Sequence, residues 1–266
     1  METAARRGQN VGVRLHLKFR QPGRPARPVL APEDADWIGR ARQPFEANVV
    51  GTHVPVVFRQ YARILHPAWS GPDDPVRWDE VAGSSGRTMH ALAQWESISR
   101  PPDGHRSPHL FVQAPPRGGL PPHQLASLCH LVANFTTTPD RCFIGVWEGY
   151  GWLPLSDLAS ARELRLEQRT FLVTEGPIAA AMSVGWRHPD GSFQPEPPTL
   201  LWPVDRAWFV ASDPDLDSTY VGGSTSMIEA LLATPGLEAW PIGSTDRVTF
   251  DSDTINGVPE GVGQPL

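Results

Sequence analysis

Three aspartates alternate along one short stretch of the chain, at Asp213, Asp215 and Asp217. Alternate carboxylates of this kind converge on a hard cation in calcium-binding loops. The stretch departs from such a loop, since Ser218 stands where the loop needs glycine and Ser224 where it needs glutamate. The spacing therefore favours a hairpin turn with solvated carboxylates. A weak cation site and recognition of a basic partner are the alternatives.

A glycine pair, Gly222 and Gly223, follows just before a serine-rich helix start. Backbone N–H groups at such a junction can bind anions. The stretch lacks the lysine of a P-loop and the spacing of a dinucleotide-binding loop. Residues 201–266 also carry ten acidic and two basic residues, a balance that repels phosphate. We therefore expect a structural turn whose glycines adopt positive φ angles, before a helix capped jointly by Ser226 and Glu229.

Glu148 stands among three aromatic residues, Trp147, Tyr150 and Trp152. A carboxylate in an aromatic cleft is typical of enzymes that act on sugars. Glu148 is therefore one candidate catalytic residue, and Asp205 is the other. An aromatic-lined hairpin turn is the structural alternative for the stretch around Glu148.

The histidine and cysteine patterns indicate no bound metal or cofactor. The histidines show no HxH ligand spacing, and Cys129 and Cys142 do not form a CxxC pair. No GxSxG motif marks a nucleophilic serine. We expect two buried thiols, no metal and no cofactor.

Tryptophan is abundant, with 10 in the chain, and several stand near aspartates in the C-terminal half. Aromatic side chains outside the core often anchor partner proteins. Trp202 precedes Asp205 and Arg206, which makes this stretch the best candidate for the rim of such a surface. The expected binding residues are Trp202, Asp205, Arg206, Asp213, Asp215, Asp217, Tyr220, Gly222 and Gly223.

Short helices and strands must position these residues, and their limits follow from apolar periodicity and from turn residues. The predicted helices cover about 57–65, 78–82, 88–98, 121–135, 158–164, 177–184 and 227–233. The predicted strands cover about 110–112, 142–147, 170–173, 207–212, 218–221 and 238–242. Because helices and strands do not alternate regularly, we expect an α+β fold. It has a mixed or mostly antiparallel sheet flanked by several short helices, with a helix-rich N-terminal half.

The chain divides into a lead-in, one domain and a tail. Residues 1–48 are expected to form a flexible basic lead-in, in which residues 11–19 alternate like a strand. Residues 49–242 show no linker and are expected to form a single globular α+β domain. Residues 243–266 are acidic and glycine-rich, and we expect a tail that frays after about Asn256.

Bulk composition narrows the classes of function. A net charge of −6 argues against general nucleic-acid binding. No window reaches 18 consecutive apolar residues, and the N-terminus lacks the apolar run of a signal peptide. We therefore expect a cytoplasmic protein that does not act in a membrane, and the oligomeric state stays open.

Four motifs of the chain resemble those of a family of uncharacterised actinobacterial proteins. They are Tyr61-Ala-Arg-Ile-Leu-His-Pro67, Trp78-Asp-Glu-Val-Ala82, Leu201-Trp-Pro-Val-Asp-Arg-Ala-Trp208 and Tyr220-Val-Gly-Gly-Ser224. The resemblance spans about residues 52–242. It implies a bacterial, cytoplasmic, single-domain protein, and it brings no activity, cofactor or catalytic residue with it.

These features favour a protein-binding module of regulatory or immunity type, whose partner is another protein. Its surface would be the acidic, tryptophan-rich face around residues 202–223. A hydrolase with carboxylates in an aromatic cleft is one alternative, and a weak cation-binding protein is another. A deep pocket with two titratable groups would favour the enzyme, and a shallow apolar patch would favour the binding module.

Overall fold

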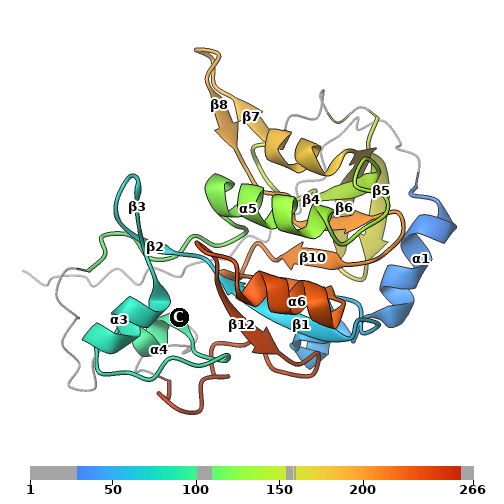
Figure 1. The fold of residues 1–266 in the computed structure, drawn as a ribbon. Helices are drawn as coiled ribbons and strands as arrows, with labels where there is room; N and C mark the ends of the chain where they lie inside the picture. Colours follow the sequence, from blue (N-terminus) through green and yellow to red (C-terminus); the bar gives the residue numbers. More distant parts are fainter. Residues whose placement is uncertain (1–28, 101–109, 154–157, 159, 259–266) are drawn as a thin grey trace, which may run out of the picture.

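Eight antiparallel strands form the sheet around which the chain is built (Figure 1). The computed structural model describes residues 29–100, 110–153, 158 and 160–258. In spatial order the strands are β12 (Glu238–Ile242), β1 (Gln60–Leu65), β11 (Ser218–Gly223), β10 (Phe209–Ser212), β9 (Leu200–Pro203), β4 (Cys142–Trp147), β6 (Arg169–Gly176) and β5 (Arg162–Leu166). Helices accompany this sheet, so the predicted α+β class is confirmed.

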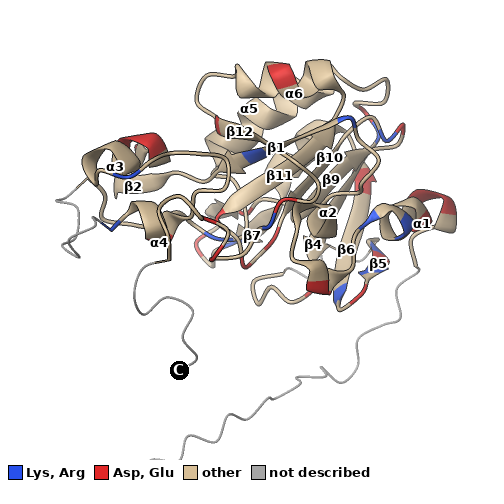
Figure 2. Ribbon diagram, turned by 90° about the horizontal axis from the view of Figure 1, so that it is seen from below, with Lys and Arg blue, Asp and Glu red and all other residues tan. Residues whose placement is uncertain are grey.

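One face of the sheet is covered by α5 (Pro122–Ala133), α6 (Thr225–Leu232) and the 3-10 helix η2 (Ile178–Ser183). Leu128 of α5 and Met227 of α6 are fully buried against strand residues such as Ile64. Figure 2 shows α5 and α6 together along this side. The apolar faces of these helices contribute to the largest of the hydrophobic clusters.

The opposite face is covered by α1 (Pro32–Ala41) and α2 (Val50–His53), and the 3-10 helix η1 (Phe45–Ala47) lies between them in sequence. Ile38 and Val50 are fully buried there. Tyr61 faces this cluster, whereas its neighbour Ala62 faces the other one, as the two-residue period of a strand requires.

A third cluster lies beside the sheet, where β2 (Ala68–Gly71) and β3 (Asp74–Val76) meet α3 (Trp78–Ser84) and α4 (Trp95–Ile98). The guanidinium group of Arg63 on β1 joins it to the sheet. This group donates to Ser218 Oγ at 2.9 Å and to the carbonyls of Ala91 and Ala93, and it lies 5.3 Å from the Trp78 ring centroid. Arg63 is almost completely buried.

A small hairpin, formed by β7 (Gly185–Arg187) and β8 (Phe193–Pro195), projects from the sheet beyond η2 (Figure 1). The strand β12 is one edge of the large sheet, and Pro241 lies in it opposite Ala62. No helix among the described residues is long and apolar enough to cross a membrane.

Several predicted elements are confirmed, including the helix α5, the strands β4 and β12, and the hairpin of β10 and β11. The predicted helix over residues 57–65 is wrong, because residues 60–65 form the strand β1. Five of its six residues are buried, since the strand lies inside a sheet that is covered on both faces. Burial on both faces removes the alternation that marks a half-exposed strand.

Three other predicted helices differ from the structure. Residues 88–98 fold into turns followed by the short helix α4, and residues 162–166 form β5 in place of a helix over 158–164. The alanine-rich segment after Pro177 is the 3-10 helix η2. The strand predicted at 110–112 is reduced to an isolated bridge between Trp69 and Gln113.

The segments assigned to a lead-in and a tail contribute to the packed structure. Residues 1–28, with the strand predicted at 11–19, lie outside the described residues, but residues 32–41 form α1. Beyond residue 242, Val248 is buried and Asp253 Oδ1 accepts a 2.8 Å hydrogen bond from His90 Nε2. The packed part of the chain therefore reaches further at both ends than the predicted domain of 49–242.

The start of α3 is capped by a side chain from a distant strand. Glu238 on β12 is 5% exposed, and its carboxylate accepts hydrogen bonds from Trp78 N at 2.7 Å and from Asp79 N at 2.9 Å. Two N–H groups that the helix leaves unpaired are thereby satisfied. This contact fixes the third cluster to the edge of the sheet.

We expect Glu238→Ala to lower the free energy of unfolding by about 2–3 kcal/mol, because the N–H groups of Trp78 and Asp79 lose a charged acceptor. Chemical denaturation measures this change. Glu229→Ala, at an exposed position of α6, is the matched control and should change stability by less than about 0.5 kcal/mol. Equal effects of the two substitutions would show that the cap contributes nothing.

Candidate functional site

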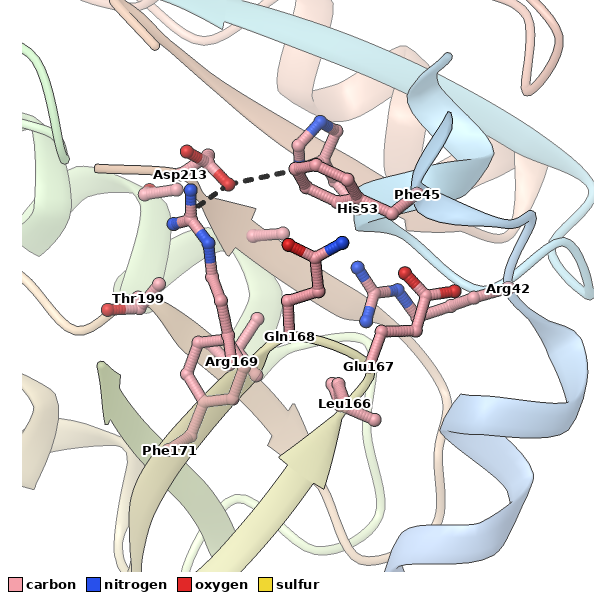
Figure 3. A pocket seen from close by; sticks show the side chains of 13 residues that line it. Arg42, Phe45, His53, Leu166, Glu167, Gln168, Arg169, Phe171, Thr199 and Asp213 are labelled. Carbon is pink, nitrogen blue, oxygen red and sulfur yellow. Dashed lines mark ion pairs between the residues drawn. The ribbon is translucent and has the colours of Figure 1, made fainter. Parts of the chain in front are cut away.

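A polar hollow opens where α2, the β5–β6 turn and the β10–β11 turn meet (Figure 3). It consists of two adjoining depressions that share Phe45, His53, Arg169 and Asp213. The larger has a volume of about 290 Å³, and the smaller, which Arg42 lines, has about 30 Å³. Figure 3 shows the side chains of Arg42, Gln168 and Arg169 directed into it. We call it the arginine hollow.

Arg169 holds the acidic turn between β10 and β11. Its Nη1 lies 3.2 Å from Asp213 Oδ2, and its Nη2 lies 2.7 Å from Asp215 Oδ2. Its guanidinium group also lies 5.1 Å from the centroid of the Trp147 ring. Asp217 pairs instead with Arg63, at 3.7 Å. The alternating carboxylates therefore bind two arginines, and among the described residues no group of acidic, histidine or cysteine side chains could hold a metal ion.

His53 lies beside this ion pair. Its Nδ1 is 3.5 Å from Asp213 Oδ2, and its ring stacks on Tyr220 with centroids 5.8 Å apart. Burial, together with the positive charges of Arg42 and Arg169, lowers the pKa of His53 to about 3. The imidazole is therefore neutral at physiological pH.

Arg42 reaches the hollow from the end of α1, and its Nη2 donates to the carbonyl of Thr52. Burial lowers the pKa of its guanidinium group. Its Nε is buried and makes no hydrogen bond within the described structure, and the same is true of Arg169 Nη1. The hollow thus contains one cationic donor without an acceptor, Arg42 Nε, whereas Arg169 Nη1 remains in the ion pair with Asp213 Oδ2.

A second buried histidine lies on the other side of the acidic turn. His66 Nδ1 is 2.7 Å from the Pro116 carbonyl, so this nitrogen carries the proton and donates it. Nε2 then accepts from Thr219 Oγ1 at 2.9 Å, and Thr219 Oγ1 lies 2.6 Å from Ser212 Oγ. Burial lowers the pKa of His66 to about 4.

An aromatic hollow of about 190 Å³ lies next to the arginine hollow. Its walls are the rings of Trp69, Tyr150 and Trp152 together with the loop 116–122, and Glu196 is the carboxylate in its lining. The aromatic cleft expected around Glu148 therefore exists in part. Glu148 itself is half-buried and is not one of the residues that line either hollow.

The expected tryptophan-rich face is buried. Trp202 is 0% exposed and stacks between Phe143, at 5.2 Å, and Phe209, at 5.5 Å. Tyr220 is buried in the same cluster. Figure 2 shows acidic and basic residues interspersed over the ribbon. Trp202 and Tyr220 therefore support the fold and cannot present a rim to a partner.

Asp205 and Arg206 make structural contacts. Asp205 accepts hydrogen bonds from Thr136 Oγ1 at 2.8 Å and from Thr137 N at 2.7 Å, which fixes the turn after α5. Arg206 has a positive φ of 57°, lies 5.4 Å from the Trp37 ring centroid and donates to the carbonyl of Glu33. Neither residue lines one of the hollows described above.

The glycine pair serves close packing and does not form the expected turn. Gly222 and Gly223 belong to β11, and neither has a positive φ. A Cβ atom at Gly222 would lie 2.5 Å from the Phe58 ring, and one at Gly223 would lie 2.3 Å from Met227 Cε. The helix that follows is capped by Ser224, whose Oγ accepts from Met227 N, and the predicted cap by Ser226 and Glu229 is wrong.

Sequence reasoning found the acidic turn of this site but missed its cations and its histidine. Arg42, His53 and Arg169 come from separate segments, and no spacing connects them. Glu196 was missed because it lies in a proline-rich loop far from the aromatic residues in sequence. Only the long-range pairing of the strands brings these residues together.

We expect the free energy of unfolding to fall by roughly 3 kcal/mol between pH 7 and pH 5 through His53 and His66. Both have pKa values far below the ordinary 6.5 when folded. The unfolded chain therefore takes up protons that the folded chain excludes. Their stabilising effect is complete above pH 6.5 and is lost as pH falls towards 4. Chemical denaturation at several pH values measures how the free energy of unfolding depends on pH.

The loss of unfolding free energy between pH 7 and pH 5 should be smaller in His53→Gln. It should be unchanged in His130→Gln, because His130 is exposed on α5. If the wild-type protein and His53→Gln lost stability equally between pH 7 and pH 5, His53 would not be held neutral by the fold.

Comparison of the chain with protein-family models, with curated proteins and with solved structures finds no match to any of the three. The candidate site therefore rests on its geometry alone. Two adjoining hollows meet at one end of the sheet, one lined by Arg42 and Arg169 and one with aromatic walls and a carboxylate.

Proposed function

We propose that the protein binds a small molecule through a carboxylate or phosphate group in the arginine hollow. The observation that carries this proposal is the buried donor atom Arg42 Nε, which makes no hydrogen bond within the described structure. A buried donor without an acceptor costs about 1–3 kcal/mol, and more on a charged group. An oxyanion would supply the acceptors, and guanidinium groups fit its geometry well.

The acidic residues nearby do not cancel this preference. Asp213 and Asp215 are held by Arg169, and Asp217 is paired with Arg63. Burial also raises the pKa of Asp213, which favours its uncharged form. Arg42 lies within electrostatic range of the exposed Glu167, but its buried Nε remains without an acceptor.

His53 favours binding over general base catalysis. A base with a pKa of about 3 takes a proton poorly near neutral pH, where the best general bases have pKa values close to 7. A neutral imidazole can still contact a ligand through a hydrogen bond. A bound anion would offset the positive charges of Arg42 and Arg169, and the pKa of His53 would then rise.

The wider part of the hollow suggests that the ligand also has an apolar portion. Leu216, Val248 and Phe250 line it, and Phe250 is 51% exposed at its edge. An apolar wall beside fixed polar groups is the common composition of small-molecule sites. A protein partner on a tryptophan-rich face is less well supported, because Trp202 and Trp208 are fully buried.

We expect Arg42→Gln to weaken the binding of inorganic phosphate or citrate at least about tenfold, which is the loss of one charged hydrogen-bonding group. Isothermal titration calorimetry measures the affinity, and NMR of the imidazole measures the pKa of His53, which should rise when either probe binds. The control is Arg165→Gln, since Arg165 is exposed on β5 and pairs with Glu163.

The proposal fails if neither probe changes the pKa of His53, or if Arg42→Gln and Arg165→Gln bind the probes equally well. The pKa measurement is needed because ions can also bind weakly at exposed arginines. Arg42→Gln is preferred over a substitution of Arg169, which also holds the acidic turn in place.

A further inference from the structure

We infer that the aromatic hollow binds an organic ammonium group. Of the residues that line this hollow, only Arg117 also lines the arginine hollow, and the inference does not depend on the anion site. Its basis is the chemistry of the lining, namely three aromatic rings, one carboxylate and a loop rich in proline.

Three aromatic rings line the hollow. Tyr150 and Trp152 stack on each other, with centroids 5.3 Å apart and planes 26° apart, and Trp69 lies elsewhere in the lining. The cation–π pairs within the described residues involve Arg63, Arg169, Arg187 and Arg206, and none uses these three rings. Cations, above all alkylated ammonium groups, are attracted to the faces of such rings.

The backbone around the hollow is poor in free donors. Pro116, Pro121, Pro122 and Pro197 in the lining carry no N–H group. The N–H groups of Trp69, Gly118, Tyr150 and Glu196 are already donated to backbone carbonyls. A cation needs no hydrogen-bond donor from this part of the backbone.

Glu196 supplies the negative charge. It is partly buried, and burial raises its pKa, while a hydrogen bond from the Trp186 side chain favours the ionised form. The hydrogen bond also orients the carboxylate. A carboxylate beside aromatic rings is a suitable counter-ion for an ammonium group that cannot itself donate hydrogen bonds.

Arg117 separates the two hollows. It is exposed and contributes to the lining of both. Its positive charge favours an anion on one side and opposes a cation on the other. Removing this charge should therefore strengthen ammonium binding, an effect that a purely structural role of the hollow would not produce.

Tetramethylammonium is the probe for this site, and tert-butanol is its neutral counterpart of similar shape. We expect calorimetry and NMR of the indole N–H groups to show binding of the cation and none of the alcohol. Trp152→Leu and Glu196→Gln should each weaken binding at least about fivefold, and Arg117→Gln should strengthen it about twofold. Glu175→Gln, on β6 outside the hollow, should leave it unchanged.

The same titration with choline and with a peptide carrying trimethyl-lysine distinguishes two sources of the group. Preference for either over tert-butanol supports the inference and indicates whether the ammonium belongs to a small molecule or to a side chain. The inference is overturned if tert-butanol or glucose binds as well as tetramethylammonium. It is also overturned if Glu196→Gln, folded by circular dichroism, binds the cation as the wild-type protein does.

Discussion

The buried guanidinium group of Arg63 is the constraint on which the rest of the structure depends. Removing such a charge from water costs several kcal/mol unless partners surround it. The fold supplies Ser218 Oγ, the carbonyls of Ala91 and Ala93, the Asp217 carboxylate and the face of Trp78. These partners belong to β11, the acidic turn and the third cluster. One side chain therefore fixes three parts of the molecule. Because Arg63 holds Asp217 in place, Asp213 and Asp215 of the same turn lie within reach of Arg169.

The end of the sheet brings opposite chemistries close together. The arginine hollow has a buried cationic donor without an acceptor, Arg42 Nε, whereas the aromatic hollow has a carboxylate, Glu196. Tyr150 lies between the two hollows. Its hydroxyl group interacts electrostatically with Asp213 and Arg169 of the arginine hollow and with Glu196 of the aromatic hollow. Burial raises the pKa of that hydroxyl to about 12, so it carries no charge of its own at neutral pH. A single ligand that is anionic at one end and cationic at the other would complement both hollows.

The fold was predictable where local signals agree with tertiary packing. α5 carries a clear apolar stripe, and the β10–β11 hairpin surrounds an aspartate-rich turn. β1 was misassigned because Tyr61, Ile64 and Leu65 match helical spacing, and a strand covered on both faces shows no alternation. Asp213 was identified as a site residue because the spacing of the aspartates resembles that of a metal-binding loop. In the structure these carboxylates pair with arginine instead. Arg42, His53 and Glu196 could not be placed, since only strand order brings them to the site.

The position of β1 in the sheet governs when the protein can form. This strand comes early in the chain, yet its neighbours are β11 and β12, near the other end. Arg63 and its partner Ser218 are 155 residues apart. Pairings between such distant segments form late and slow the folding of a domain. During synthesis β1 therefore has neither neighbour until roughly 150 further residues have been made. An arginine on its surface makes the unpaired strand less prone to aggregate than an apolar residue would.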